Sequence, residues 1–149
     1  MKMVRTWVLV ADAKRARLLE LQGGAGGLKP VKDMDFETEL PRTHELVDDR
    51  QPRSFESVGS ARHAIGGRAD PHREKKRHFS AAIAQILNEQ LEGHAYEKLV
   101  VIAPPQALGD LREYFSPAVR AVISHEVAKD FTKTPNSEIL DHLKSMLPL

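Results

Sequence analysis

The sequence contains no cysteine, few aromatic residues and no long apolar run. Without cysteine there can be no disulfide framework and no thiolate metal site, and this absence is typical of a reducing compartment. No segment approaches the roughly 20 apolar residues of a membrane-spanning helix. The run "TWVLVADA" at residues 6–13 is followed at once by "KRAR", whereas a secretory signal needs about 7–15 clean apolar residues. We therefore expect a cytoplasmic protein that does not associate with membranes.

An excess of one charge sign is also missing, because the formal net charge of the 149-residue chain is +1. The molecule as a whole is therefore not a polycation. Its apolar fraction of 41% and charged fraction of 29% are ordinary for a globular protein. The length is that of one domain, so we predict a single domain over residues 1–149.

The first part of the chain shows strand patterns separated by turn signals. Apolar and β-branched residues predict strands over residues 4–11, 16–22 and 28–36. The sequence "GGAGG" at residues 23–27 lacks the Lys-Ser/Thr of a phosphate-binding loop, so we interpret it as a hairpin turn. These three strands are predicted to form an antiparallel meander.

The second part alternates helices with strands. Asp70 and Pro71 are a typical N-cap and first helical residue, and an apolar stripe continues from there to Gly93. The patterns predict helices over residues 71–92, 107–115 and 136–146, and strands over residues 98–105 and 118–127. The order βββαβαβα predicts an α/β domain with a mixed sheet of about five strands and helices packed on its faces.

A long segment without periodicity, residues 38–70, precedes the first long helix at about 71–92. Loops of this length are uncommon in compact domains and are usually functional or disordered. The stretch Arg50–His78 holds eight basic and three acidic side chains, a net charge of +5, so the remaining residues carry −4. Positive charge is therefore concentrated in and just after the segment that lacks a hydrophobic periodicity.

Arginine beside glycine suits phosphate groups, because arginine donates in a planar fork and glycine lets the main chain approach closely. Cations in a first helical turn oppose the helix dipole, which favours an anionic partner. The alternative is that the charged helix start is only a solvated face. The predicted nucleic-acid-binding residues are Arg50, Arg53, Arg62, His63, Gly66, Gly67, Arg68, Arg73, Lys76 and Arg77.

The segments "GGR" and "EKKRHFSAAIAQIL" resemble the middle domain of archaeal and eukaryotic peptide-chain release factors, in which a Gly-Gly-Gln loop precedes a basic helix. The start "WVLVADAKRARLLEL" and the strand "LVVIAPP" are similar to that domain in the same order. The chain looks closest to the bacterial branch of this superfamily, whose members carry patterns like "VADAKRARLLE", "DDRQPRSFES", "RHA" and "APPQALGDLR". That branch is labelled as protein required for attachment to host cells.

The resemblance implies a release-factor-like α/β fold and a role at tRNA or the ribosome. Release factors have a glutamine where this sequence has Arg68, and that glutamine is tied to positioning the water for ester hydrolysis. Its replacement argues against peptidyl-tRNA hydrolysis. What remains implied is an RNA-binding domain associated with the ribosome or tRNA.

Two other functional hypotheses remain open. Asp12, with Asp48 and Asp49, could hold Mg²⁺ for a small hydrolase or nuclease that also uses His63, although ordinary turn and cap chemistry is the favoured interpretation of these carboxylates. The long loop could instead order on a protein partner. The histidine spacing fits no standard metal site, so we expect no metal and no cofactor. No catalytic residue and no oligomeric state is predicted.

Overall fold

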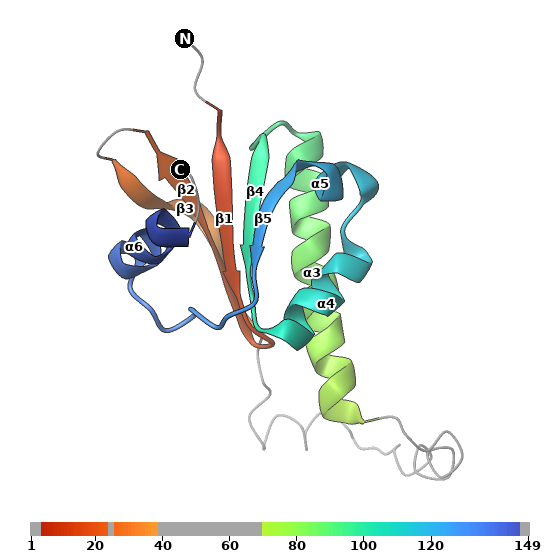
Figure 1. Ribbon diagram of the computed structural model, residues 1–149. Coiled ribbons are helices and arrows are strands. Elements are labelled where there is room, and N and C mark those ends of the chain that lie inside the picture. The colour runs from red at the N-terminus through yellow and green to blue at the C-terminus, as the bar shows by residue number, and fades with distance from the viewer. Residues whose placement is uncertain (1–3, 24–25, 39–69, 147–149) are drawn as a thin grey trace, which may run out of the picture.

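The chain folds into a five-stranded mixed sheet with helices on both faces (Figure 1). The computed structural model describes residues 4–23, 26–38 and 70–146. The strands are β1 (Thr6–Ala11), β2 (Arg15–Gln22), β3 (Gly27–Glu37), β4 (Lys98–Ile102) and β5 (Ile123–Val127). The helices are α3 (Pro71–Glu92), α4 (Pro105–Tyr114), α5 (Pro117–Val122) and α6 (Asn136–Met146). The predicted α/β class and mixed sheet are confirmed.

The sheet has the strand order β3-β2-β1-β4-β5. β1, β2 and β3 pair antiparallel, which confirms the predicted meander, and the hairpin between β2 and β3 spans the glycine-rich segment. β4 is parallel to β1, and β5 is parallel to β4. The carboxyl ends of β1, β4 and β5 therefore meet at one edge of the sheet, which we call the carboxyl edge.

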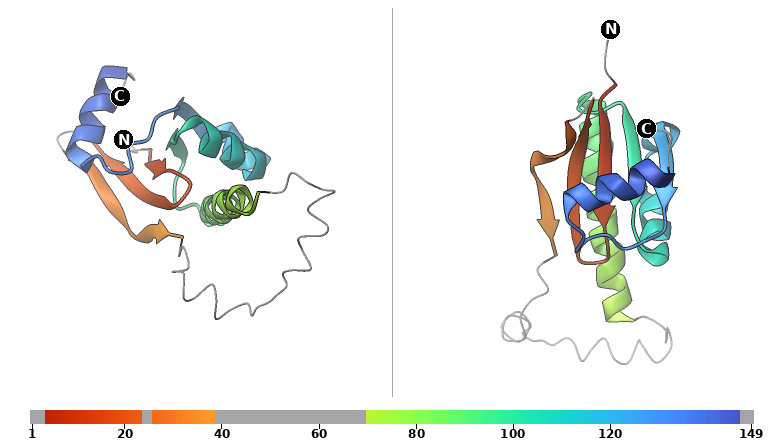
Figure 2. Two further views of the ribbon diagram at one scale, coloured as in Figure 1. Left: turned by 90° about the horizontal axis from the view of Figure 1, so that it is seen from below. Right: turned by 60° about the vertical axis from the view of Figure 1, so that its left-hand side comes forward.

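Two apolar layers lie against the sheet, one on each face. Trp7 and Leu9 of β1 point into the layer shared with α3, α4 and α5, whereas Val8 and Val10 point into the layer covered by α6. Figure 2 shows α6 and α3 on opposite sides of the strands. Because the central strands are buried on both faces, their sequences are continuous apolar runs instead of alternating ones.

Helix α3 begins as the sequence predicts. The Asp70 side chain accepts a hydrogen bond from the His72 amide at 3.1 Å, and Pro71 is the first helical residue. Four side chains of the predicted stripe and its neighbours are buried against the sheet: Ser80, Ile83, Ala84 and Leu87. This packing fixes the direction in which the basic end of α3 projects.

The end of α3 differs in one detail from the glycine stop that the sequence suggests. Gly93 does cap the helix, but its φ is −84°, and His94 adopts the left-handed conformation with φ 61°. The amides of His94 and Ala95 donate to the carbonyls of Leu91 and Gln90, each at 2.9 Å. A histidine therefore occupies the position for which glycine has the lowest conformational cost.

The predicted strand over residues 118–127 is wrong in its first half. Residues 117–122 form α5, because the Ser116 hydroxyl accepts a hydrogen bond from the Val119 amide at 3.2 Å and Pro117 occupies the first helical position. The strand starts only at Ile123. The short apolar run fits the periods of both a strand and a helix, and the Ser-Pro start signal decides for the helix.

The predicted long loop falls on residues 39–69, which lie outside the described residues. Within the described ranges, no helix combines the length and the apolar character that crossing a membrane requires.

Candidate nucleic-acid interface

The predicted phosphate-binding residues divide into two groups. Arg73, Lys76 and Arg77 lie on α3, whose N-terminal end extends past the carboxyl edge of the sheet (Figure 1). The others lie outside the described residues: Arg50, Arg53, Arg62, His63, Gly66, Gly67 and Arg68. The geometry of the site is therefore built from α3 and its neighbours.

Arg73 is held by a carboxylate of the next helix. Its Nη1 and Nη2 donate to Oδ2 and Oδ1 of Asp110, both at 2.7 Å, and Asp110 is only 6% exposed. The hydrogen bond to Asp110 raises the pKa of the Arg73 guanidinium. Two parallel charge-assisted hydrogen bonds are strong and directional. Arg73 therefore fastens α3 to α4, and we leave it out of the surface that could receive an anion.

Arg77 lies one turn further along the same seam between α3 and α4. Its Nη2 donates to the Tyr114 hydroxyl at 3.1 Å and its Nη1 to Glu74 at 3.3 Å. The hydrogen bond to Tyr114 raises the pKa of Arg77, and the negative charge of Glu74 adds to this. The Arg77 side chain remains 37% exposed. It is therefore oriented by two neighbours and still reaches solvent.

Lys75 and Lys76 complete the basic end of α3. Lys75 is exposed and Lys76 is half-buried. Within the described ranges, neither lysine forms an ion pair. Lys76 and Ser80 are four residues apart and so share a face. The face of α3 on which Ser80 is buried thus carries positive charge near the N-terminal end of the helix.

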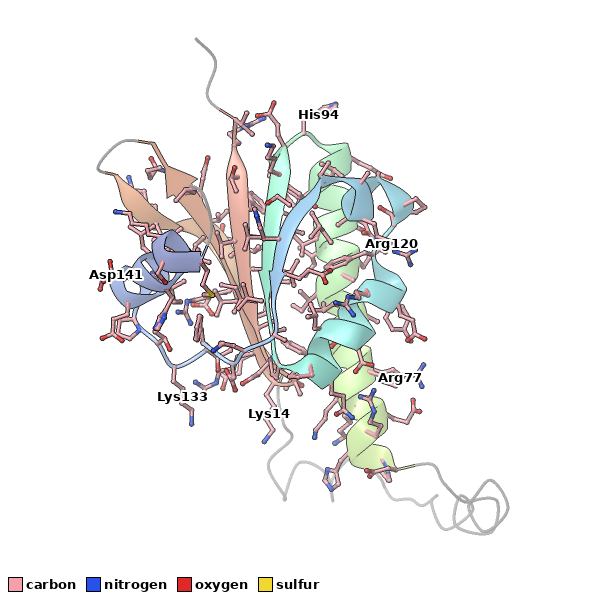
Figure 3. The ribbon with its side chains drawn as sticks, in the orientation of Figure 1. Lys14, Arg77, His94, Arg120, Lys133 and Asp141 are labelled. Carbon is pink, nitrogen blue, oxygen red and sulfur yellow. The ribbon has the colours of Figure 1, made fainter. Side chains whose placement is uncertain are left out.

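Further lysines come to the same edge from distant parts of the sequence. Lys14 lies in the turn between β1 and β2, and Lys133 lies in the connection from β5 to α6; Figure 3 shows both pointing away from the carboxyl edge. Lys129 follows the end of β5 and is exposed. We define the carboxyl-edge surface by its exposed or half-exposed cations: Lys14, Lys75, Lys76, Arg77, Lys129 and Lys133.

Several carboxylates near this edge face the main chain. The Asp12 Oδ1 accepts hydrogen bonds from the amides of Lys14 and Arg15, at 2.7 and 2.8 Å. The Asp130 Oδ1 accepts from the Thr132 amide at 3.0 Å, and Asp70 caps α3. Turn and cap chemistry therefore accounts for Asp12, while the lysines beside it extend outward.

The described residues give no structural support to the hydrolase hypothesis. Its other named residues, Asp48, Asp49 and His63, lie outside them. In the described ranges, no group of three or more histidine, aspartate and glutamate side chains converges as a metal site would require. The remaining oxygen of Asp12 accepts a hydrogen bond from the Thr132 hydroxyl at 3.1 Å.

Arg17 of β2 is a structural residue. It donates to the carbonyls of Thr132 and Thr134 at 2.8 and 2.7 Å, and to the Asn136 side chain at 3.2 Å. Burial is the main cause that lowers the pKa of Arg17, against the attraction of Asp35. It therefore anchors the start of α6 on β2 and is not part of the carboxyl-edge surface.

Sequence reasoning missed six residues at the site: Lys14, Lys75, Lys129, Lys133, Asp110 and Tyr114. Lys14 and Lys133 are isolated lysines in turns, and only the meeting of parallel strands brings them to the same end of the sheet. Asp110 and Tyr114 are spaced four apart on α4, as Arg73 and Arg77 are on α3. That matched spacing was the one available signal that two helices face each other through these positions.

The fold and the site together define a small α/β domain with a basic carboxyl edge. The chain belongs to the family described as protein required for attachment to host cells, which matches residues 7–143. This confirms the family expected from the sequence patterns. The link to the release factor middle domain stays a prediction. No curated protein matches the sequence.

One solved structure to which the chain is similar is the Aquifex aeolicus Ppx/GppA phosphatase, in its type II variant. The sequences are 16% identical and the TM-score is 0.41. The match covers 84% of this chain but only 35% of the phosphatase chain. The protein thus spans about a third of the length of that neighbour, and a likeness at this level carries no argument about function.

Proposed function

We propose that this protein binds RNA through the carboxyl-edge surface. The observation that supports the proposal is the placement of positive charge. The N-terminal end of α3 extends past the sheet with Lys75, Lys76 and Arg77, and Lys14 and Lys133 point outward at the same edge. Lysine and arginine side chains on one edge supply the contacts to phosphate that dominate nucleic-acid affinity.

The resemblance to the release factor middle domain favours a particular kind of RNA. In this proposal the partner is the ribosome or tRNA, and the protein binds without hydrolysing an ester. The family description names attachment to host cells and no molecule that is bound. RNA binding is therefore a molecular activity proposed in addition to that description.

The experiment measures binding of fluorescently labelled tRNA by anisotropy and sedimentation with ribosomes through a sucrose gradient at low and moderate salt. The test variant is Lys75→Glu with Lys76→Glu. We expect it to bind tRNA at least about tenfold more weakly and to remain at the top of the gradient, because two phosphate contacts become repulsions.

The matched control is Lys32→Glu with Lys98→Glu, which makes the same change in net charge. Both residues are exposed, and Lys98 is the first residue of β4, at the end of the sheet opposite the carboxyl edge. This control should bind within about threefold of the wild type. Equal losses in both variants would mean that only net charge matters, and no binding by the wild type would refute the proposed function.

A further inference from the structure

Tyr114, at the end of α4, is a solvent-exposed aromatic residue in a helix whose other large apolar side chains are buried. It is 37% exposed, whereas the next residue, Phe115, is 2% exposed. The second tyrosine, Tyr96, is 1% exposed and stacks on Trp7 with the ring centroids 4.9 Å apart. In the described part of the chain, Tyr114 is stacked on no aromatic ring. It does not serve the core as Tyr96 does.

Hydrogen bonds fix Tyr114 at both its main chain and its hydroxyl. Its carbonyl accepts from the side-chain Nδ2 of Asn88, on α3, at 3.2 Å, and Oδ1 of Asn88 accepts from the Ser116 backbone amide at 2.9 Å. Its hydroxyl accepts from Arg77 at 3.1 Å. The ring is therefore held in place before any ligand arrives, which reduces the entropy lost on binding.

One arginine contacts the ring, and a second lies on the same side of the molecule. Arg77 is at the hydroxyl end of the ring, and Arg120 donates from Nη2 to the carbonyl of Arg112, two residues before Tyr114, at 3.0 Å. Figure 3 shows Arg77 and Arg120 on the same side of the molecule. Arg77 also belongs to the carboxyl-edge surface, so the aromatic residue is continuous with it.

We propose that Tyr114 stacks on an unpaired base, so that the RNA bound at this surface is single-stranded where it crosses the seam between α3 and α4. This inference rests on the proposed function and adds the substrate class. Proteins that bind single strands combine cationic contacts to the backbone with aromatic rings on which bases stack. Bases inside a duplex are already stacked and cannot reach a side chain in this way.

An ion pair at the hydroxyl end of the ring indicates which kind of energy the site supplies. The Glu74 carboxylate lies 3.3 Å from Nη1 of Arg77, the same arginine that donates to the Tyr114 hydroxyl. A phosphate must compete with this carboxylate for Arg77, so stacking and not charge is the main contribution expected from Tyr114. Removing the ring should therefore weaken binding without changing its dependence on salt.

The test compares a single-stranded RNA of about 12 nucleotides that carries 2-aminopurine with a blunt duplex of the same length. Tyr114→Leu removes the ring but keeps an apolar side chain, and Tyr114→Phe keeps the ring but removes the hydroxyl. Tyr114→Leu should bind the single strand about 5- to 100-fold more weakly and should lose the 2-aminopurine quenching that the wild type produces. Its duplex binding and its salt slope should match the wild type, and Tyr114→Phe should still quench.

Unchanged binding and quenching in Tyr114→Leu would overturn this inference. If the Lys75→Glu, Lys76→Glu variant still lost binding in the same assay, the proposed function would stand without it. If the wild type bound neither RNA, both would be refuted. Circular dichroism and the thermal midpoint of each variant show whether a loss comes from unfolding.

Discussion

Neutralising Lys75 and Lys76 together measures how many phosphates the basic end of α3 contacts. The two residues are adjacent in sequence, so they point about 100° apart around the helix and would contact different phosphates. Each phosphate contact contributes about 0.7 to the slope of log affinity against log salt for a single strand. The variant Lys75→Gln with Lys76→Gln should therefore have a slope about 1.4 shallower than the wild type.

That difference predicts a specific change in affinity. Between about 50 and 200 mM salt, the wild type should lose about sevenfold more affinity than the variant, because a fourfold change raised to the power 1.4 is about seven. Anisotropy titrations at four or more salt concentrations give both slopes. The control Lys32→Gln with Lys98→Gln should keep the wild-type slope.

Equal slopes of log affinity against log salt for the wild type and the test variant would refute the reasoning. They would mean that Lys75 and Lys76 contact no phosphate, whatever their effect on affinity at one salt concentration. A slope that fell equally in the control would assign the effect to the overall charge of the protein and not to the end of α3.

Three further predictions concern residues to which the structure gives a role. Arg73→Ala should lower the urea midpoint of unfolding, because it leaves the carboxylate of Asp110 buried without its partner. The folded variant should still bind RNA as the wild type does. Weakened binding would instead assign Arg73 to the interface. His94→Gly should raise the free energy of unfolding by about 1 kcal/mol, since glycine adopts φ 61° without strain, and an unchanged urea midpoint would contradict this. Tyr96→Phe should lower the free energy of unfolding by about 0.5–1.5 kcal/mol, because it removes the hydroxyl that donates to the Leu87 carbonyl.

The Tyr96 variant also predicts a change with pH. Burial raises the pKa of the Tyr96 phenol, so the folded protein keeps its proton at pH values where the unfolded chain has lost it. This contribution to stability is fully present below the ordinary phenol pKa of about 10 and is lost as pH rises above it. Urea unfolding followed from neutral to alkaline pH should show this fall in the wild type and not in Tyr96→Phe; identical alkaline profiles would contradict the assignment.

Most of the fold could be predicted because its signals are local. Asp70 and Pro71 mark the start of α3, and the apolar run of β4 ends at prolines, so both elements were placed to within a few residues. The segment 117–122 could not be separated from β5 by periodicity, because five or six apolar and small residues fit a buried strand and a buried helical turn equally well. Its cap at Ser116 was the deciding local feature.

The site could be predicted only in part. The concentration of cations at the start of α3 is visible in the sequence, but their separate roles are not. Arg73 and Arg77 look equivalent along the chain, yet one meets the buried Asp110 and the other the exposed Tyr114. Which partner each arginine meets depends on how α3 packs against α4, and contacts between residues 37 positions apart leave no local pattern.

The sequence by itself determined the class of fold, the family and the end of α3 at which positive charge gathers, because periodicity, caps and composition act over a few residues. Only the tertiary structure decided which of these charges form a surface. The parallel pairing of β1, β4 and β5 brings the turns with Lys14 and Lys133 to the end of the sheet that α3 passes. The packing of α3 on α4 then commits Arg73 to Asp110 and leaves Arg77 beside Tyr114, since burial stabilises one arrangement of the two helices over all others.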